Sequence, residues 1–174
     1  GPDWSSAITN IPWQIYLYTG DVRVLEENYE AITRHFRFME SMAEDWIVQY
    51  GIGDWCAPFE GKAISVNMSS FTSPVAVTDT AYFYNTADMI AKMAGVLGRQ
   101  YDEQDYQTAA EAIKGAFRAA FYDADTHRVA GDCQTSTACA IYQDLLDASE
   151  IAPAMDVLLQ QIADTDYHQD TGIL

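Results

Sequence analysis

Apolar side chains recur along most of the chain in alternating steps of three and four residues, which is the spacing of one face of an α-helix. The longest series run through residues 25–46, 83–97 and 106–120, and shorter ones run through 8–15, 138–145 and 155–162. A helix with such a face has to bury it against a neighbour. The pattern therefore predicts an all-α fold in which the helices pack against one another.

Residues that start and stop helices divide this pattern into six helices. Gly20 and Gly98 are suited to end helices in a left-handed conformation. Side chains that commonly cap helix N-termini follow at Asp21, Thr78, Asp102 and Thr135. The resulting helical hairpins pair residues 5–19 with 21–45, 79–97 with 103–121, and 135–146 with 150–164. Because the hairpins start at uneven intervals, a solenoid of fixed period does not fit.

The connections within the hairpins are short, whereas residues 46–77 and 122–134 form longer ones. A hairpin leaves and returns at the same end, so we expect these connections to share one face with residues 1–4 and 165–174. Strand signals are nearly absent, and the Ser, Asn and Pro content of residues 64–77 favours a loop over a short extended piece. Since binding groups usually lie on loops of a rigid scaffold, we expect the functional site on this face.

The net charge of the chain limits the classes of partner that it can bind. There are 26 Asp and Glu against 9 Lys and Arg, a net charge of −17. This charge repels phosphate backbones and anionic lipids, so nucleic acid and membrane partners are not expected, and no apolar run is long enough to cross a bilayer. A neutral carbohydrate is compatible with it. The 174 residues, 49% of them hydrophobic, suit one globular domain.

No metal or cofactor is predicted from the sequence. The cysteines at 56, 133 and 139 lack the short spacing of a zinc or redox motif. The three histidines share no spacing with Asp or Glu that is typical of a metal site.

Seven short motifs follow one another along the whole chain. They are PDWSSA at 2–7, PWQIY at 12–16, YTGD at 18–21 with LEENY at 25–29, GDW at 53–55, TAYFY at 80–84, QT at 134–135 and HQDTGIL at 168–174. In order and spacing this series resembles the catalytic domain of bacterial α-L-rhamnosidases, glycoside hydrolase family 78. Each motif is weak by itself, but the ordered series is specific.

The resemblance implies a fold and a reaction. The family folds as an (α/α)6 toroid of six helical hairpins, so residues 1–174 are expected to form about half of that toroid, as one unit truncated at both ends. The family removes terminal α-L-rhamnose by an inverting acid/base mechanism. Its general acid precedes the segment matching residues 2–4, and its general base follows the segment matching 171–174. No catalytic residue is therefore assigned, and this piece alone is expected to be inactive.

The same resemblance bears on location and assembly. It favours a periplasmic or secreted parent protein, whose export signal is not in this chain. Half a toroid would expose apolar helix faces that the other hairpins cover, and exposed apolar patches seek partners. We therefore expect self-association of the piece.

Two loop tryptophans are the first candidates for contact with a sugar. Trp55 follows Trp4 by 51 positions, close to the separation that the resemblance implies for two sugar-contacting tryptophans. Indole faces can stack on the apolar side of a deoxy sugar and stabilise an oxocarbenium-like transition state. The alternative is that both rings anchor their loops on the core.

Other candidates lie in the same loops. Asp54 can accept hydrogen bonds from sugar hydroxyls, or it can hold an Asx-turn. For Asp3, a helix-capping role is favoured over sugar contact. His168 can face the same pocket or stand exposed in its loop. Glu60 has no partner carboxylate in the sequence pattern, so we interpret it as a solvated loop residue rather than an acid or base.

Two other functions stay open. One is a different glycosidase on the same six-hairpin toroid, acting on another sugar. The other is a non-catalytic helical scaffold that binds a protein through its grooves. The short hairpin turns, the aromatic residues in the long loops and the irregular repeat length argue against the scaffold. The resemblance implies a rhamnose-containing carbohydrate as the partner.

Overall fold

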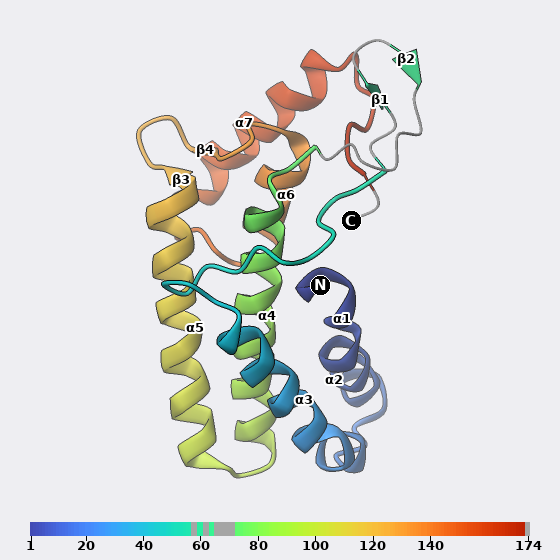
Figure 1. Ribbon diagram of the computed structural model, residues 1–174, viewed down its shortest axis with the longest axis vertical. Helices are drawn as coiled ribbons and strands as arrows, with labels where there is room; N and C mark the ends of the chain where they lie inside the picture. The colour runs from blue at the N-terminus through green and yellow to red at the C-terminus, as the bar shows by residue number, and fades with distance from the viewer. Residues whose placement is uncertain (57–58, 61–62, 65–71, 173–174) are drawn as a thin grey trace.

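The computed structural model describes residues 1–56, 59–60, 63–64 and 72–172, with side chains over 1–56 and 72–172. After a single turn, α1 (Pro2–Ser5), the chain forms three helical hairpins. They pair α2 (Ala7–Thr19) with α3 (Arg23–Ser41), α4 (Val75–Val96) with α5 (Gln100–Phe121), and α6 (Gln134–Tyr142) with α7 (Ile151–Asp164). The predicted all-α fold and its three hairpins are confirmed (Figure 1).

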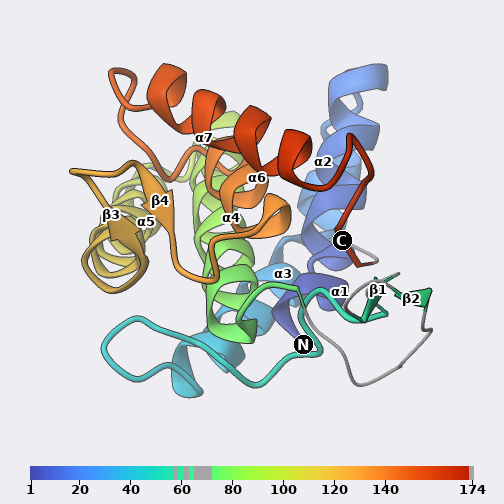
Figure 2. The same ribbon diagram turned by 90° about the horizontal axis from the view of Figure 1, so that it is seen from above.

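Helix α4 is the central element of the bundle. It contacts α1, α2, α3, α5 and α6, and the view along the bundle in Figure 2 places it in the middle. On α4, Phe83 is fully buried and stacks on Phe36 of α3, with 5.1 Å between the ring centroids. Trp46 also stacks against Phe83, as its place on an apolar stripe predicts. A helix that is apolar on most of its sides has to be enclosed by others, which explains the central position of α4.

Helix α4 begins earlier than the sequence pattern predicts. It starts at Val75, directly after the extended residue Pro74, so the predicted cap Thr78 lies inside the first turn and donates to the Val75 carbonyl at 3.3 Å. The predicted glycine ends are correct, since Gly20 and Gly98 have φ values of 70° and 69°. Glycine at a helix end therefore gave better boundaries here than Thr as a start signal.

Two further predicted caps are wrong because their side chains have distant partners. Helix α5 begins before Asp102, whose carboxylate accepts a hydrogen bond from Tyr29 Oη at 2.9 Å. Helix α6 begins one residue before Thr135, whose hydroxyl donates to the Asp54 carboxylate. Both side chains link their helix to another part of the chain instead of capping it.

Two helices end earlier than predicted. Helix α3 stops at Ser41 rather than at 45, and α6 stops at Tyr142 rather than at 146. Leu145 and Leu146 are buried although they lie outside α6, and Asp144 between them and the helix has a left-handed φ of 59°. Apolar residues at helical spacing therefore continued past the actual end of the helix.

Two short antiparallel ribbons lie within the long connections. One pairs β1 (Phe59–Glu60) with β2 (Ala63–Ile64), and the other pairs β3 (Tyr122–Asp123) with β4 (Arg128–Val129). Neither was predicted, because strands of two residues show no alternation. The turn of the second ribbon is held by Asp123 Oδ1, which accepts the amides of Asp125 and Thr126 at 2.9 and 3.3 Å.

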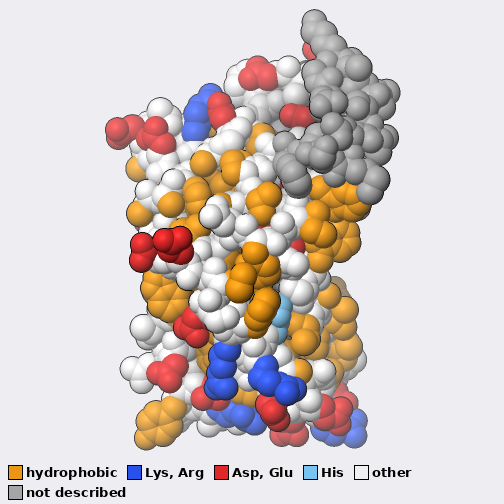
Figure 3. All heavy atoms as spheres, in the orientation of Figure 1, with side chains coloured by type: hydrophobic (Ala, Val, Ile, Leu, Met, Phe, Trp, Pro, Cys, Tyr) orange, Lys and Arg blue, Asp and Glu red, His pale blue; other side chains and the backbone are white. Residues whose placement is uncertain are grey.

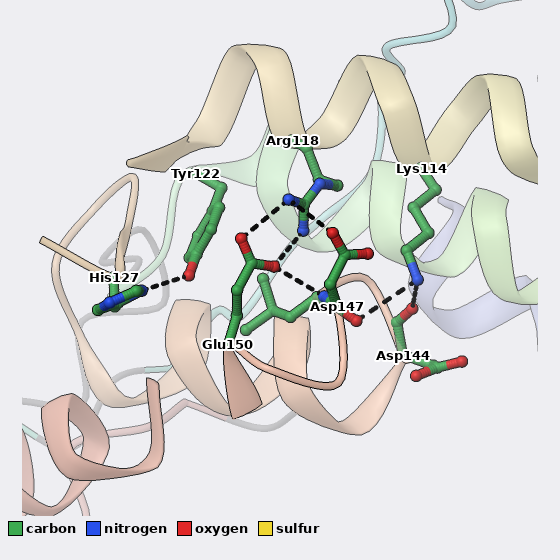
Figure 4. Close-up of polar contacts among 8 residues, drawn as sticks. Lys114, Arg118, Tyr122, His127, Asp144, Asp147 and Glu150 are labelled. Carbon is green, nitrogen blue, oxygen red and sulfur yellow. Dashed lines mark hydrogen bonds and ion pairs between the residues drawn. The ribbon is translucent and has the colours of Figure 1, made fainter. Parts of the chain in front are cut away.

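The connection between α6 and α7 is fixed to α5 by charged side chains (Figure 4). Arg118 of α5 donates to both carboxylate oxygens of Glu150, at 2.5 and 2.9 Å, and pairs with Asp147 at 3.2 Å. The hydrogen bonds from Arg118 lower the pKa of Glu150. One turn earlier, Lys114 donates to the Asp144 carbonyl at 2.7 Å. A forked guanidinium on a carboxylate gives both orientation and strength, so this contact holds the third hairpin against the second.

Two of the three short connections lie at the opposite end of the molecule from the ribbons, whereas the α6–α7 connection lies against the last turn of α5. Figure 1 shows the α2–α3 and α4–α5 turns at the lower end and both ribbons at the upper end. This agrees with the arrangement expected from the hairpin topology, in which the long loops share one face. The loops that carry the candidate residues therefore meet near the N-terminal end of α4.

Candidate functional site

The segment before α2 is joined directly to the loop that carries Trp55. Asp3 is buried, and its Oδ2 accepts the amide of Gly53 at 2.7 Å while its Oδ1 accepts the amide of Trp4 at 2.8 Å. The helix-capping role predicted for Asp3 is wrong, because Asp3 lies inside α1 and neither α1 nor α2 has a side-chain cap. Its carboxylate instead binds the amide of Gly53, 50 positions away. One carboxylate thus fixes the backbone beside Trp4 and the backbone two residues before Trp55.

The two tryptophans differ in exposure. Trp4 is 47% exposed, whereas Trp55 is half-buried and its Nε1 is buried without a hydrogen-bond partner among the described residues. The Trp55 amide donates to the Gly53 carbonyl at 3.0 Å, which closes a tight turn. Trp4 and the GDW turn therefore lie at the same rim of the bundle, and we call residues 1–6, 48–56, 72–73, 134–135 and 168–172 the rim segments.

Asp54 joins four of the rim segments. Its carboxylate is fully buried, and Oδ2 accepts hydrogen bonds from the Thr72 hydroxyl at 2.6 Å, from the Gly172 amide at 2.8 Å and from the Thr135 hydroxyl. The Thr72 and Thr135 hydroxyls also lie 3.2 Å apart. A carboxylate oxygen is the acceptor that can take several donors at once. Asp54 therefore organises the rim, and its direct contact with a sugar stays a prediction.

The C-terminal segment approaches the GDW turn so closely that only glycine fits at 172. A Cβ added to Gly172 would lie 2.4 Å from the Trp55 carbonyl oxygen and 2.6 Å from Asp54 Oδ1. Atoms at such distances overlap, so any side chain at 172 would move the turn. The TG dipeptide of the last motif is thereby explained by packing.

His168 lies in the same C-terminal segment. Its side chain is exposed, and Nδ1 lies 3.0 Å from the Thr165 carbonyl oxygen. The His168 carbonyl accepts Gln134 Nε2 at 3.0 Å, and Gln134 Oε1 accepts the amide of Asp170 at 3.3 Å. Gln134, the first residue of α6, thus ties this segment to the rim. Contact between His168 and a sugar stays a prediction, and the side chain of Glu60 lies outside the described residues.

A buried carboxylate on α4 was not identified from the sequence. Asp79 is fully buried, and its Oδ2 accepts the amide of Gly51 at 2.6 Å. Burial raises the pKa of Asp79 to about 7, the amide of Gly51 lowers it, and the charge of Asp3 raises it. A signal was present in the sequence: the apolar stripe of α4 that starts at Phe83 reaches Asp79 when it is extended back by four residues. A carboxylate in a stripe of core positions is unusual and favours a specific role.

A cavity of about 320 Å³ adjoins the rim between α4 and α6. Its lining includes Tyr82 of α4, Tyr142 of α6 and the rim residues Thr135 and Thr171. Burial raises the pKa of Tyr82 to about 12, so its phenol is neutral at physiological pH and can donate a hydrogen bond. The volume lies at the lower end of the range for small-ligand pockets.

Neither a metal-binding cluster nor a membrane-spanning helix is present among the described residues. No group of three or more His, Cys, Asp or Glu side chains in that part of the chain is placed to hold a metal ion. No helix within the described ranges has the length and apolar character of a membrane span.

Three consecutive helical hairpins, with long loops gathered at one rim, are the architecture of part of a six-hairpin glycosidase domain. Residues 1–174 match the bacterial alpha-L-rhamnosidase 6 hairpin glycosidase domain, and the chain belongs to this family.

Curated relatives and solved structures agree with this assignment. Alpha-L-rhamnosidases of Alteromonas sp. (strain LOR) and Formosa agariphila are each 31% identical to this chain. Each match covers 98% of this chain, but only 19% of the Alteromonas protein and 18% of the Formosa protein. The alpha-L-rhamnosidase structure from Dictyoglumus thermophilum matches with a TM-score of 0.84 and 32% identity over 98% of this chain and 19% of that one. The structure of the Streptomyces avermitilis alpha-L-rhamnosidase complexed with L-rhamnose matches with a TM-score of 0.82 and 28% identity. This match covers 95% of this chain and 15% of that one. The chain therefore spans less than a fifth of each of these relatives.

Proposed function

We propose that this chain is part of the catalytic domain of an inverting α-L-rhamnosidase and forms one wall of the pocket for the terminal rhamnose. The observation that carries the proposal is the bond between Asp3 and Gly53, because it fixes Trp4 and Trp55 at one rim. The relative from Streptomyces avermitilis was solved with L-rhamnose, which supports a rhamnose-containing substrate here.

In this proposal the tryptophans supply shape and electrostatics, and residues outside the chain supply the proton transfers. An indole face packs well against the apolar face and methyl group of a deoxy sugar. Its electron-rich surface also favours the positive charge that develops at the anomeric carbon. The general acid and general base would be two glutamates outside residues 1–174, about 6.5–9.5 Å apart, with a water between the base and the sugar.

Asp54 and His168 complete the proposed sugar-binding set. Asp54 lies directly before Trp55, and the bond from the Gly172 amide to Asp54 brings the segment of His168 to the same rim. Polar groups placed around an aromatic wall give a sugar pocket its orientation and specificity. The cavity between α4 and α6 lies next to Thr135 and Thr171 and offers room beside this set.

The first prediction concerns turnover. The isolated 174-residue chain is expected to show no hydrolysis of an aryl α-L-rhamnoside, because both proposed carboxylic acids lie outside it. The full-length protein that contains this segment is expected to hydrolyse it. In that protein, Trp4→Ala and Trp55→Ala should each lower kcat/KM about fivefold to tenfold, since a lost aromatic contact is worth ~1–1.5 kcal/mol. Steady-state kinetics measure both effects.

The control is Tyr101→Ala, which removes an exposed aromatic residue at the start of α5, at the lower end of Figure 1. It should leave the kinetics unchanged. Saturable hydrolysis by the isolated chain would contradict the location of the acid and base. Preference of the full-length protein for a different terminal sugar would favour the alternative of another six-hairpin glycosidase.

We also propose that the isolated chain associates with itself through α2. Five large apolar side chains of this helix are exposed, and Figure 3 shows apolar surface along the edge formed by α1 and α2. They are Ile8, Ile11, Ile15, Leu17 and Tyr18. An apolar face of this extent is a typical interaction surface. Light scattering of the isolated chain should show dimers or larger species, and Ile11→Lys should shift them towards monomer. A strict monomer at all concentrations would count against this proposal.

A further inference from the structure

The loop that leads to Trp55 is held to α4 by polar side chains at two places. The Thr80 hydroxyl lies within hydrogen-bond distance of both the amide and the carbonyl of Val48, at 3.2 and 3.3 Å. Asp79, one residue earlier on α4, accepts the amide of Gly51 at 2.6 Å. Two residues further along the loop, the amide of Gly53 is bound to Asp3 of α1. The loop thus reaches the rim with its backbone fixed at three successive points.

The contact at Gly51 leaves no room for adjustment. A Cβ added to Gly51 would lie 2.2 Å from Asp79 Oδ1 and 2.7 Å from Oδ2, so the carboxylate packs directly on the loop backbone. Only three residues separate Gly51 from Trp55. The bond from the Trp55 amide to the Gly53 carbonyl closes residues 53–55 into a turn. Together with the bonds at Gly53 and Asp54, the contact at Gly51 therefore helps to set the position of the turn that carries Trp55.

We propose that Asp79 is a positioning residue for the sugar site: through Gly51, its ionised carboxylate holds Trp55 in register with Trp4, and the site binds a neutral hexose more tightly when Asp79 is charged than when it is protonated. The inference rests on the proposed function in so far as it concerns the sugar. A charged acceptor holds an amide more strongly than a neutral one, so protonation loosens the contact with Gly51. The residue itself does not contact the sugar.

The surroundings of Asp79 allow this change near neutral pH. Burial raises its pKa to about 7. The groups that face it are the amides of Gly51 and Tyr50 in the loop and the Asp3 carboxylate from α1. The Tyr50 phenol is buried in the same region, and burial followed by the charges of Asp79 and Asp3 raises its pKa to about 12.

The test follows Trp55 itself in the full-length protein. Tryptophan is replaced biosynthetically by 5-fluorotryptophan, and the ¹⁹F signal of Trp55 is assigned with Trp55→Phe. In the wild type this signal should shift between pH 5 and 9 with a midpoint near neutral pH. In Asp79→Asn, which keeps an oxygen acceptor for Gly51 but cannot ionise, the shift should be absent. Asp88→Asn, the same change elsewhere on α4, is the matched control and should behave as the wild type.

Affinity for L-rhamnose is measured on the same samples. The Kd of the wild type should be about threefold to tenfold lower at pH 8 than at pH 5.5, the difference between a charge-assisted and a neutral hydrogen bond. Asp79→Asn should keep the weaker, low-pH value at both pH values. An acid or base elsewhere in the site titrates in both proteins, so its effect on the Kd would be the same in both.

The outcomes are distinguishable. A Trp55 signal that titrates in Asp79→Asn as in the wild type overturns the positioning role. If the wild type shows no response to rhamnose, the proposed function fails, and the ¹⁹F titration still decides the role of Asp79. Should Asp79→Asn not fold, Gly51→Ala perturbs the same contact from the loop side. An unchanged Trp55 signal in that variant overturns the inference, and a displaced one supports it.

Discussion

Replacing Asp54 by alanine is expected to cause the largest loss of stability at the rim, about 2–4 kcal/mol in the free energy of unfolding. The substitution removes the acceptor of three hydrogen bonds and leaves the Gly172 amide and the hydroxyls of Thr72 and Thr135 without it. The two hydroxyls are 3.2 Å apart and can partly satisfy each other, so most of the cost falls on the half-buried amide of Gly172. Urea denaturation of the full-length protein measures the effect.

Graded variants separate hydrogen bonding from packing at Asp54. Thr135→Val is close in shape but lacks the hydroxyl, so it should cost part of the loss seen in Asp54→Ala, about 1 kcal/mol. Thr135→Ser retains the hydroxyl and should restore most of that part. Asp88→Ala, a carboxylate paired with Lys92 on the surface of α4, should have a much smaller effect. Equal losses in Asp88→Ala and Asp54→Ala would show that the four joined segments do not depend on Asp54.

The helices could be predicted because their signal is local. Apolar residues at helical spacing predicted all six long helices, and Gly20 and Gly98 predicted two of their ends. The predicted caps at Thr78, Asp102 and Thr135 were wrong for a physical reason. A hydroxyl or carboxylate near a helix start can serve the helix or a distant partner, and the sequence pattern does not distinguish these uses.

The meeting of the loops followed from topology, but the contacts that hold them did not. Hairpins return to the end they leave, so the segments with Trp4 and Trp55 were expected at one rim. The bonds from Thr135 and Gly172 to Asp54 span 81 and 118 positions, and no local pattern reports a pairing over such distances. The motifs at 53–55 and 168–174 contain the residues that meet there. The close approach of Gly172 to Asp54 and Trp55 is visible only in three dimensions.

Asp79 shows what a conflict within a pattern can indicate. Its position belongs to the core-facing stripe of α4, where an apolar side chain would be cheaper, yet a carboxylate occupies it. Places where a sequence departs from its own pattern are often functional. In this chain the departure lies directly behind the loop that leads to Trp55.

The stability of Asp79→Asn relative to the wild type is expected to rise with pH. In the folded protein the pKa of Asp79 is about 7, against an ordinary value of 3.8 in the unfolded chain. Between these values the folded state keeps a proton that the unfolded state has released. The stabilisation from this group is therefore fully present below pH 3.8, falls as the pH rises, and is lost above about 7. From pH 4 to pH 8 the stability of Asp79→Asn should rise relative to the wild type by about 2–4 kcal/mol.

Measuring the difference at two pH values removes every constant effect of the substitution, such as the amide hydrogens that asparagine adds. Urea denaturation of both proteins at pH 4, 6 and 8 gives the two curves, and Asp88→Asn should run parallel to the wild type. Parallel curves for Asp79→Asn would mean that the carboxyl ionises as readily in the folded protein as in the unfolded chain. A widening gap would mean that the protein retains a charge at α4 at a cost in stability near neutral pH. A cost of that kind is expected where a carboxylate is kept for the position of Trp55 rather than for the fold.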